Sequence, residues 1–508
     1  MNRAIDRRRF LRHLLAGAGA LAAAPSLLAG GFALAGEPAT FARGLRQHPW
    51  LAGWEGVRSE TLGPSVLEVQ GKIPAELSGT LYRNGPAWNE RAGFRYEHWF
   101  DGDGMVHAWR LDEGRVTHHA RMVATPKFTR EHKAGRFLFP AAGTRVPGEL
   151  PVRNNDDVNP ANTAVMTLGG RLFALCEAGS AFELDPDQLG TLGAVTWRPD
   201  LATVPFSAHP LVDRDGSVWN FGSVSLMGGS DLIIWHLGAD GRLISADTLH
   251  TPILGYLHSF AMTEQHLIFT LLPFVQAEGE GAFFERMRLQ PDQPLRIAVV
   301  DKHAPGEARW FEADFAAIYH FGDAYERDGR IVMRAVTHAD IERARSPMRQ
   351  AMNGHAQAEE DDGRLRELHL DLRSGNARWH DTGIAGIEFP LFDVRAPSDR
   401  AAKIFAPTQV GAHSAPYFNA VAAFDVTAGS SQVHRYGASI LAEEHVLVPK
   451  PGSARAGRGW LVGTLLDSAR SRSGIAILDA EHLERGPVAE AWLPLTVPLG
   501  FHGAFVAR

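Results

Sequence analysis

Cysteine is almost absent from this sequence of 508 residues, in which Cys176 is the only one. A chain with one cysteine cannot form an internal disulfide, so its fold does not depend on disulfide bonds. Basic residues are not in excess either, because 51 Lys and Arg stand against 58 Asp and Glu and the formal net charge is −7. Without a surplus of positive charge, the sequence gives no indication of a nucleic-acid partner.

Several familiar local motifs are missing as well. The sequence contains no Walker loop, no Gly-x-Gly-x-x-Gly turn, no nucleophile elbow and no cysteine cluster. The usual signals of nucleotide binding, serine hydrolase chemistry and finger-type zinc are therefore lacking. The segment Asp101-Gly-Asp-Gly104 resembles the start of a calcium loop, but the later ligands and the closing glutamate do not follow. A turn is the expected structure there.

A long apolar run occurs at the N-terminus and nowhere else in the sequence. Arg7, Arg8 and Arg9 precede a stretch rich in alanine and glycine, which ends at Ala33-Leu-Ala35. Such a pattern predicts a signal peptide over residues 1–36 and export to the periplasm by the twin-arginine route. The alternative is an uncleaved membrane anchor, because the run is about long enough to span a bilayer. One domain is expected over residues 37–508.

Short apolar runs separated by glycine-containing turns dominate that domain. Such turns are a strong hairpin signal, because glycine readily adopts the positive φ that they require. They occur at residues 111–116, 168–172, 213–218, 239–243, 327–331, 361–365 and 373–376. An all-β fold is predicted. Sandwich, barrel and propeller all fit, and the chain length favours a propeller, which protects many short strand edges by radial repetition.

Two stretches break the β pattern. Residues 278–292 place Phe283, Phe284 and Met287 among charged residues, and residues 338–360 have a helical pattern. Insertions in a propeller commonly lie on the face that carries the binding site, so we expect them to form a cap over it. Ordinary surface helices are the alternative, and contact of the cap with a membrane surface is a further hypothesis.

Histidine is abundant, with 23 residues in the chain, and four histidines lie in apolar, strand-like contexts. Taken singly, each is better explained as a core or turn histidine than as a ligand. Their wide separation in sequence also excludes a finger-type zinc site. The four are His209, His258, His320 and His502.

A series of motifs resembles the carotenoid cleavage oxygenase family and runs through nearly all of the expected domain. The first are Leu81-Tyr-Arg-Asn-Gly-Pro86 and His98-Trp-Phe-Asp-Gly-Asp-Gly-Met-Val-His107. The rest follow in the family's order and include the segments 160–163, 170–177, 207–210, 257–260, 319–326, 387–390, 443–451 and 500–503.

The resemblance implies a seven-bladed β-propeller with helical insertions capping the active-site face and one Fe(II) on its axis. Carried over by motif, the iron ligands would be His209, His258, His320 and His502. Three glutamates would hold the ligands from behind, namely Glu177, Glu388 and Glu444. Thr163 matches a threonine that lies near an open iron position in the family and is the candidate catalytic residue. The chain departs from the family pattern at His445, where a proline usually follows the last glutamate.

The implied chemistry agrees with the residue types. Four neutral imidazoles suit ferrous iron and leave two positions of an octahedron free, and a carboxylate can fix the second ring nitrogen of each ligand. The family uses O2 to split an alkene into aldehydes or ketones. A carotenoid or apocarotenoid is the expected hydrophobic substrate, and a lignin-derived hydroxystilbene or phenylpropene is the alternative. Lys127 is interpreted either as a solvated surface residue or as a polar contact for a phenol. A non-catalytic binding propeller remains the alternative of another class.

Overall fold

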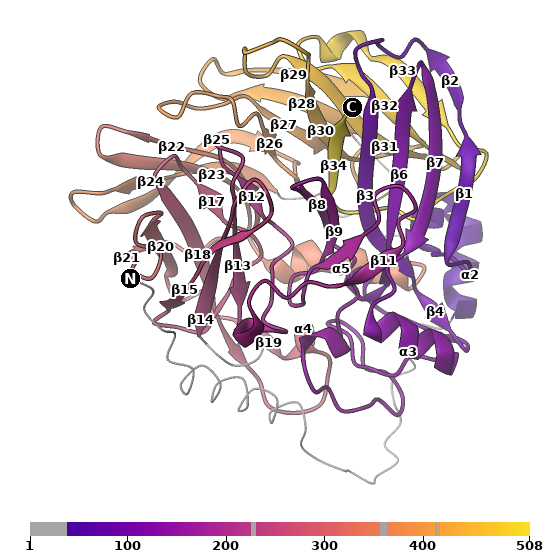
Figure 1. Cartoon of the computed structure of the whole chain (residues 1–508), viewed down its shortest axis with the longest axis horizontal. Helices are drawn as coiled ribbons and strands as arrows, with labels where there is room; N and C mark the ends of the chain where they lie inside the picture. Colours follow the sequence, from indigo (N-terminus) through magenta and orange to yellow (C-terminus); the bar gives the residue numbers. More distant parts are fainter. Residues whose placement is uncertain (1–37, 225–229, 356–362, 412–414, 416) are drawn as a thin grey trace.

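The computed structural model describes residues 38–224, 230–355, 363–411, 415 and 417–508. Strands are the main regular element of these residues. Seven sheets of four to six strands surround a common centre (Figure 1). The predicted all-β, seven-bladed propeller is therefore confirmed. The signal peptide predicted over residues 1–36 lies outside the described residues. None of the helices in the described ranges combines the length and the apolar character needed to cross a membrane.

Four sheets are built mostly from the N-terminal half of the chain, and the final strand β34 joins the first of them. The first sheet comprises β1 (Thr61–Val66), β7 (Arg115–Met122), β6 (Asp103–Asp112), β3 (Gly79–Trp88) and β34 (Gly503–Ala507). The second comprises β11 (Thr191–Ala194), β10 (Phe182–Leu184), β9 (Arg171–Leu175) and β8 (Ala164–Leu168). The third comprises β12 (Leu211–Val212), β13 (Val218–Ser223), β14 (Asp231–Leu237) and β15 (Leu243–His250). The fourth comprises β16 (Gly255–Tyr256), β17 (Ala261–Met262), β18 (His266–Gln276), β19 (Met287–Leu289), β20 (Leu295–Asp301) and β21 (Arg309–Ala313).

The remaining blades follow in chain order. The fifth sheet comprises β22 (Ala317–Arg327), β23 (Arg330–His338), β24 (Arg364–Asp371) and β25 (Ala377–Ala385). The sixth comprises β26 (Leu391–Phe392), β27 (Ile404–Thr408), β28 (Ala420–Asp425) and β29 (Ser430–Arg435). The seventh comprises β2 (Glu68–Gly71), β33 (Pro487–Trp492), β32 (Arg472–Asp479), β31 (Gly459–Asp467) and β30 (Ile440–Pro449). A separate ribbon pairs β4 (Glu90–Arg91) with β5 (Phe94–Arg95).

Both ends of the chain contribute to closing the ring. The C-terminal strand β34 pairs antiparallel with β3, from Gly79 opposite Ala507 to Arg83 opposite Gly503. The early strand β2 in turn pairs with β33 of the seventh sheet. The first and last blades are therefore each built from distant parts of the sequence, and hydrogen bonds close the ring without a disulfide. Around the centre, neighbouring inner strands are in contact in the order β8, β34, β30, β26, β22 and β17.

The predicted turns mostly connect antiparallel neighbours. Six of the seven glycine turns join adjacent strands of one sheet, as β6 to β7 and β24 to β25 illustrate. The exception is the turn at residues 361–365. Residues 361 and 362 lie outside the described residues, and Gly363 leads from an insertion into β24 instead of closing a tight hairpin.

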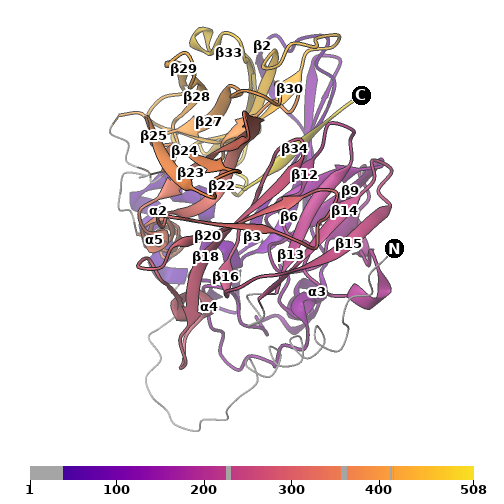
Figure 2. The same ribbon diagram turned by 90° about the vertical axis from the view of Figure 1, so that its left-hand side faces the viewer.

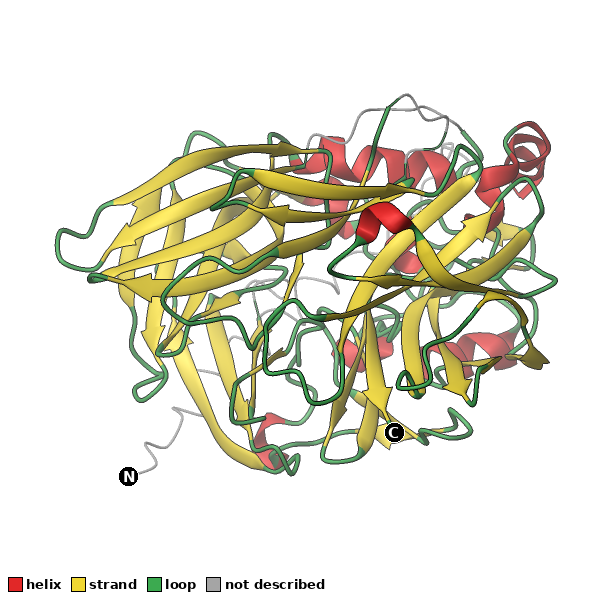
Figure 3. Ribbon diagram, turned by 90° about the horizontal axis from the view of Figure 1, so that it is seen from above, coloured by secondary structure: helices red, strands yellow, loops and turns green. Residues whose placement is uncertain are grey.

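Of the two predicted insertions, the second contains the longer helix. Helix α5 (Ile341–Met352) lies within residues 338–360, as expected. The first stretch forms only one helical turn, α4 (Phe283–Arg286), before β19 pairs with β18, because the alternation at Met287–Leu289 suits a strand. Helices α2 (Pro38–Gln47) and α5 lie together beside the sheets (Figure 2), and Gly44 approaches Gly354 closely. Figure 3 shows several helices gathered along one side of the β-structure.

Helix α3 shows how local sequence sets the boundaries of an element. It covers Pro126–Ala134, and the Thr125 side chain accepts a hydrogen bond from the backbone N–H of Phe128. Proline is favourable in the first helical turn because its missing N–H would have no partner there. Gly135 ends the helix with a φ of 64°, a left-handed conformation that glycine adopts without strain. The helix buries Lys127, Phe128 and Glu131 against the first sheet region.

Candidate metal centre

The four predicted ligands come from four different blades. His209 lies just before β12, His258 between β16 and β17, His320 within β22, and His502 directly before β34. Three of these positions are on or next to a strand at the start of a blade, and His502 directly precedes the strand that closes the ring. The fold thereby brings His209 and His502, which are 293 residues apart in the sequence, close together near the centre.

The four imidazoles converge. One ring nitrogen from each lies within 4.8 Å of the others. The Nε2 atoms of His209 and His258 are 2.9 Å apart, and those of His320 and His502 are 3.2 Å apart. The structure thus brings together all four histidines that the motifs single out. It describes their arrangement, while their role as iron ligands stays a prediction.

Three of the histidines are fixed from behind by the three predicted glutamates. His258 Nδ1 donates to Glu177 Oε2 at 2.6 Å, and His320 Nδ1 donates to Glu388 Oε2 at 2.6 Å. His502 Nδ1 donates to Glu444 Oε1 at 2.9 Å. A neutral imidazole that donates from Nδ1 carries its lone pair on Nε2. Three lone pairs therefore point toward one another beside His209, an arrangement that fits a cation between them and is unfavourable without one.

Burial favours the unprotonated form of two of the predicted ligands, His320 and His209. It lowers the pKa of His320 to about 4, although the neighbouring Glu388 partly opposes the shift. Burial also lowers the pKa of His209 well below its usual value, and the other three imidazoles act in the same direction. Neutral imidazole is the form that binds a metal, so these rings are available as ligands near neutral pH.

Two of the three carboxylates, Glu388 and Glu444, have lowered pKa values although they are buried. Burial alone would raise the pKa of Glu388, but the charge and hydrogen bonds of His320 and His338 outweigh it and lower that pKa. For Glu444, burial is likewise outweighed by His502, Arg83 and the backbone N–H of Gly503. Negative charge behind the imidazoles offsets the charge of a bound cation and holds each ring in one orientation.

Each carboxylate has an outer partner that sequence reasoning missed. The hydroxyl of Tyr256 donates to Glu177 Oε2 at 3.0 Å. Arg83 Nη1 lies 3.4 Å from Glu444 Oε2. His338 Nε2 donates to Glu388 Oε1 at 2.9 Å. Arg83 and Tyr256 lie within or beside quoted motifs, and His338 is the first residue of the predicted helical insertion. No local pattern connects any of them to a glutamate.

Two β-bulges aim the site residues. In β22, Ile318 pairs with Thr337 and Phe321 with Ala335, so Tyr319 and His320 together oppose one residue. In β30, Ala442 pairs with Leu465 and His445 with Gly463. Glu443 and Glu444 therefore oppose a single residue as well. A bulge re-aims side chains that a regular strand would send to alternate faces.

The departure from the family pattern lies beside the second bulge. His445 follows Glu444 directly, and its Nδ1 donates to the Glu443 carbonyl at 2.8 Å. Its Nε2 lies 2.7 Å from the Tyr436 hydroxyl. The imidazole also fills the space over Gly463, where a built Cβ atom would approach the ring to 2.4 Å. His445 thus packs within the seventh sheet, and Glu444 still reaches His502.

Thr163 lies next to the chain segment of His502. Its carbonyl accepts a hydrogen bond from the His502 backbone N–H at 3.2 Å, and its hydroxyl donates to Asn162 Oδ1 at 3.0 Å. The residue is therefore close to one predicted ligand. Its role beside an open metal position stays a prediction.

An aromatic cluster adjoins the imidazoles. The Phe389 ring centroid lies 4.9 Å from that of His320 and 5.1 Å from that of His502. Phe389 packs against a buried cluster that includes Tyr96, Trp99, Phe137, Tyr417, Phe418 and Phe501. Helix α5 contributes Ala351 and Met352 to the same cluster, so the insertion covers the region next to the predicted ligands.

Lys127 is not a solvated surface residue, and that interpretation was wrong. Its side chain is 1% exposed, and its Nζ donates to Asp103 Oδ1 at 2.7 Å, Glu131 Oε2 at 2.9 Å and the Tyr96 hydroxyl at 2.9 Å. Arg91 also pairs with Asp103, at 3.2 Å. Neighbouring carboxylates outweigh burial and raise the pKa of Lys127 well above its usual value.

Comparisons with known proteins agree with this geometry. The family model described as retinal pigment epithelial membrane protein matches residues 54–507. The apocarotenoid-15,15'-oxygenase of Synechocystis sp. is 28% identical over 499 residues, covering 91% of this chain and 97% of that protein. Resveratrol cleavage oxygenase 1 of Aspergillus fumigatus is 28% identical over 471 residues, covering 87% and 92%. A cobalt-substituted Synechocystis apocarotenoid oxygenase structure superimposes with a TM-score of 0.82 at 25% identity, covering 91% and 98%.

Proposed function

The chain belongs to the retinal pigment epithelial membrane protein family of carotenoid cleavage oxygenases, and we propose that it is an Fe(II)-dependent dioxygenase. It would cleave a carbon–carbon double bond of a carotenoid or apocarotenoid to aldehyde or ketone products. The observation that carries this proposal is the convergence of four imidazoles, three of them backed by carboxylates.

His209, His258, His320 and His502 would hold the iron through one ring nitrogen each. Bound there, ferrous iron would supply the redox chemistry that activates O2. Both oxygen atoms of O2 enter the two carbonyl products of the cleaved alkene, so the overall reaction balances without an added reductant. It also requires no side-chain nucleophile.

The side chains of the protein would orient the histidine rings and balance the charge of the bound iron. Glu177, Glu388 and Glu444 keep a proton on the Nδ1 atom of their histidines and thereby direct each Nε2 lone pair inward. The Phe389 ring, packed against His320 and His502, offers the apolar surface that a polyene needs beside the ligands. Water is excluded from that side because the aromatic cluster around Phe389 is buried.

A hydroxystilbene or phenylpropene is the second candidate substrate, and the surroundings of Lys127 favour it. The Tyr96 hydroxyl accepts a hydrogen bond from the Lys127 ammonium and retains its own proton to donate. Tyr96 belongs to the same aromatic cluster that Phe389 joins. A phenol bound near Tyr96 would find a polarised donor there, whereas a carotenoid hydrocarbon offers it no acceptor.

The export of the protein is part of the same proposal. The twin-arginine route transports folded proteins, so iron could be inserted in the cytoplasm before zinc or copper compete for the imidazoles. Support comes from Arg7 and Arg8 ahead of the apolar run. Active protein that reaches the periplasm after both are changed to lysine would contradict it.

Metal content and O2-dependent cleavage of the anaerobically purified protein test the proposal. An apocarotenoid and a hydroxystilbene are offered in parallel to the wild type, to His320→Ala and to His303→Ala. His303 lies in an exposed turn and serves as a matched control for the loss of a histidine. We expect about one iron per chain in the wild type and the control and none in His320→Ala. A folded wild type without iron and inert toward both substrates would leave the binding propeller as the better explanation.

A further inference from the structure

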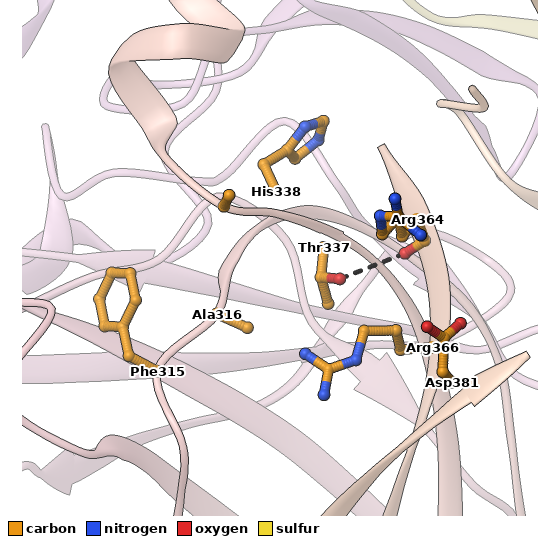
Figure 4. A pocket seen from close by; sticks show the side chains of 8 residues that line it. Phe315, Ala316, Thr337, His338, Arg364, Arg366 and Asp381 are labelled. Atoms are coloured by element: carbon orange, nitrogen blue, oxygen red, sulfur yellow. Dashed lines mark hydrogen bonds between the residues drawn. The ribbon is translucent and has the colours of Figure 1, made fainter. Parts of the chain in front are cut away.

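His338 stands at the point where the chain leaves the fifth sheet for helix α5. It is the last residue of β23, where it pairs with Ala317 of β22. Its side chain is 2% exposed. Next to it, the Thr337 hydroxyl donates to the Arg364 carbonyl at 3.3 Å and ties the strand end to β24 (Figure 4).

A surface pocket of about 300 Å³ lies on the other side of this strand end. It is lined by Phe315, Ala316, Thr337, Arg364, Arg366 and Asp381 together with His338 and Ala339. Figure 4 shows that the His338 ring points away from Arg366 in that pocket. Its hydrogen bond to Glu388 places the imidazole on the side of the metal centre.

Inside the protein, His338 completes the hydrogen bonding of one carboxylate. Glu388 Oε2 accepts from His320 Nδ1 and from the Phe389 backbone N–H, both at 2.6 Å, and Glu388 Oε1 accepts from His338 Nε2 at 2.9 Å. A carboxylate held at both oxygens has one orientation available, and the ring that it supports is fixed with it. His338 thereby constrains His320 without being a predicted ligand.

The same insertion reaches a second predicted ligand through Arg345 of α5. Arg345 Nε donates to the Tyr319 hydroxyl at 3.0 Å, and its guanidinium lies 5.7 Å from the Tyr256 ring centroid. The Tyr256 hydroxyl in turn donates to Glu177, the carboxylate behind His258. Tyr319 also meets the His258 ring edge-on, with the centroids 5.2 Å apart.

We propose that His338 and Arg345 are positioning residues of the metal centre, through which the helical insertion sets the orientation of His320 and His258. The inference rests on the proposed function, because it presumes that these histidines hold a metal. His338 acts through one carboxylate, whereas Arg345 acts through two tyrosines. The larger effect is therefore assigned to His338.

The test compares two substitutions that fill similar space at position 338. His338→Gln retains an N–H donor toward Glu388, and His338→Met does not. His118→Met is the matched control, since His118 is an equally buried histidine on β7 that bonds to His107 and not to a site residue. Fe(II) affinity is measured anaerobically by competition with a chelator, and the visible absorption spectrum of the Co(II)-loaded protein reports the ligand geometry.

We expect His338→Met to weaken Fe(II) binding about 10-fold and to shift the Co(II) spectrum, as the loss of outer support does at metal sites. His338→Gln is expected to restore the affinity to within about 2-fold and His118→Met to leave it unchanged. Arg345→Met is expected to weaken Fe(II) binding only about 3-fold. It should also change the Co(II) spectrum, in a way that differs from the change in His338→Met. If the role of these residues were purely structural, all four variants would lose thermal stability. The Fe(II) affinity would then not distinguish His338→Gln from His338→Met.

Wild-type affinity and spectrum in both His338 variants and in Arg345→Met would overturn the inference while leaving the proposed function intact. Equal weakening in His338→Gln and His338→Met would also overturn it. If His338→Met does not fold, Arg345→Met still decides, because about 3-fold weaker binding with an altered Co(II) spectrum is then required of it. A wild type that binds neither metal would instead reject the proposed function, and this inference with it.

Discussion

Two clusters of this protein hold several carboxylates close to basic side chains, and they differ in whether the charges balance. Around Lys127, the charges are balanced, because Lys127 and Arg91 face Asp103 and Glu131 and the ammonium has three acceptors. At the centre of the ring, Glu177, Glu388 and Glu444 back three imidazoles, and Arg83 is the cation paired with Glu444. The first cluster is complete within the protein, whereas the second has a surplus of negative charge and converging lone pairs.

The clusters also differ in how they are assembled. The groups around Lys127 come from residues 91–131, so a short segment with α3 brings them together. The four histidines come from residues 209–502 and meet only when the ring of blades is closed. A locally assembled cluster serves stability, and a cluster assembled by the whole fold can hold a reactive metal at its centre.

The largest effect expected from this difference is the loss of the metal site in His320→Ala. Removing one of four ligands should lower iron affinity and cleavage activity by more than about 100-fold. Iron analysis and a product assay, each beside His303→Ala, measure the two losses. If His320→Ala retained iron and activity, the metal would have to bind at another site.

Lys127→Met should affect stability and leave the metal centre in place. Removing the ammonium leaves the carboxylates of Asp103 and Glu131 buried with fewer partners, which costs about 3–5 kcal/mol of unfolding free energy. Chemical denaturation measures the loss, and iron content should stay at the wild-type value. Loss of iron with unchanged stability would mean that the two clusters are not independent.

Lys127→Met also separates the two substrate candidates. Cleavage of a hydroxystilbene should fall more than cleavage of an apocarotenoid, because only a phenol would use Tyr96 as a donor polarised by Lys127. The kcat/KM ratio for the two substrates measures the difference. An unchanged ratio would show that Lys127 has no part in substrate recognition.

Glu388→Gln should weaken the metal centre by an intermediate amount. The glutamine cannot supply the negative charge that supports His320, although it can still accept one hydrogen bond. Iron affinity should fall about 10–100-fold, the range for such outer partners. Competition with a chelator measures it, and Glu307→Gln, at an exposed position, is the control for a Glu–Gln exchange.

The smallest expected effect is a difference in pH response. The pKa of Lys127 is raised in the folded protein, because neighbouring carboxylates outweigh burial. Its stabilising contribution is therefore complete below the unfolded pKa of a lysine and is lost as the pH rises toward the folded value. The metal centre should fail at the opposite end, because protons compete with the metal for imidazole as the pH falls. Denaturation of the wild type and of Lys127→Met between neutral and alkaline pH checks the first statement, and the two stabilities should approach each other as the pH rises.

Much of the fold could be read from local patterns. Glycine between β-forming residues predicted six hairpins correctly, because a two-strand turn depends on the φ of one or two residues. The turn predicted at residues 361–365 lies partly outside the described residues, and Gly363 leads from the insertion into β24. The prediction that residues 278–292 break the β pattern was correct only in part. Met287–Leu289 alternates in a way that suits pairing with β18.

The candidate site divides in the same way. The motifs named His209, His258, His320, His502 and the three glutamates, and the structure places each glutamate against one histidine. Tyr256, His338 and Arg83 were missed, because a hydrogen bond between side chains on different blades leaves no trace in local sequence. Lys127 was misjudged for a similar reason, since two acidic partners and Tyr96 make its burial favourable.

By itself, the sequence determined the β-rich architecture, the turn positions and the residues that carry the family's motifs, because these depend on backbone conformation and residue identity. Only the tertiary structure decided that four imidazoles converge, that bulges in β22 and β30 re-aim His320 and Glu444, and that the insertion supports Glu388 through His338. Distances between blades are set by the closure of β34 against β3. That closure joins residues more than 400 positions apart, beyond the reach of any local pattern.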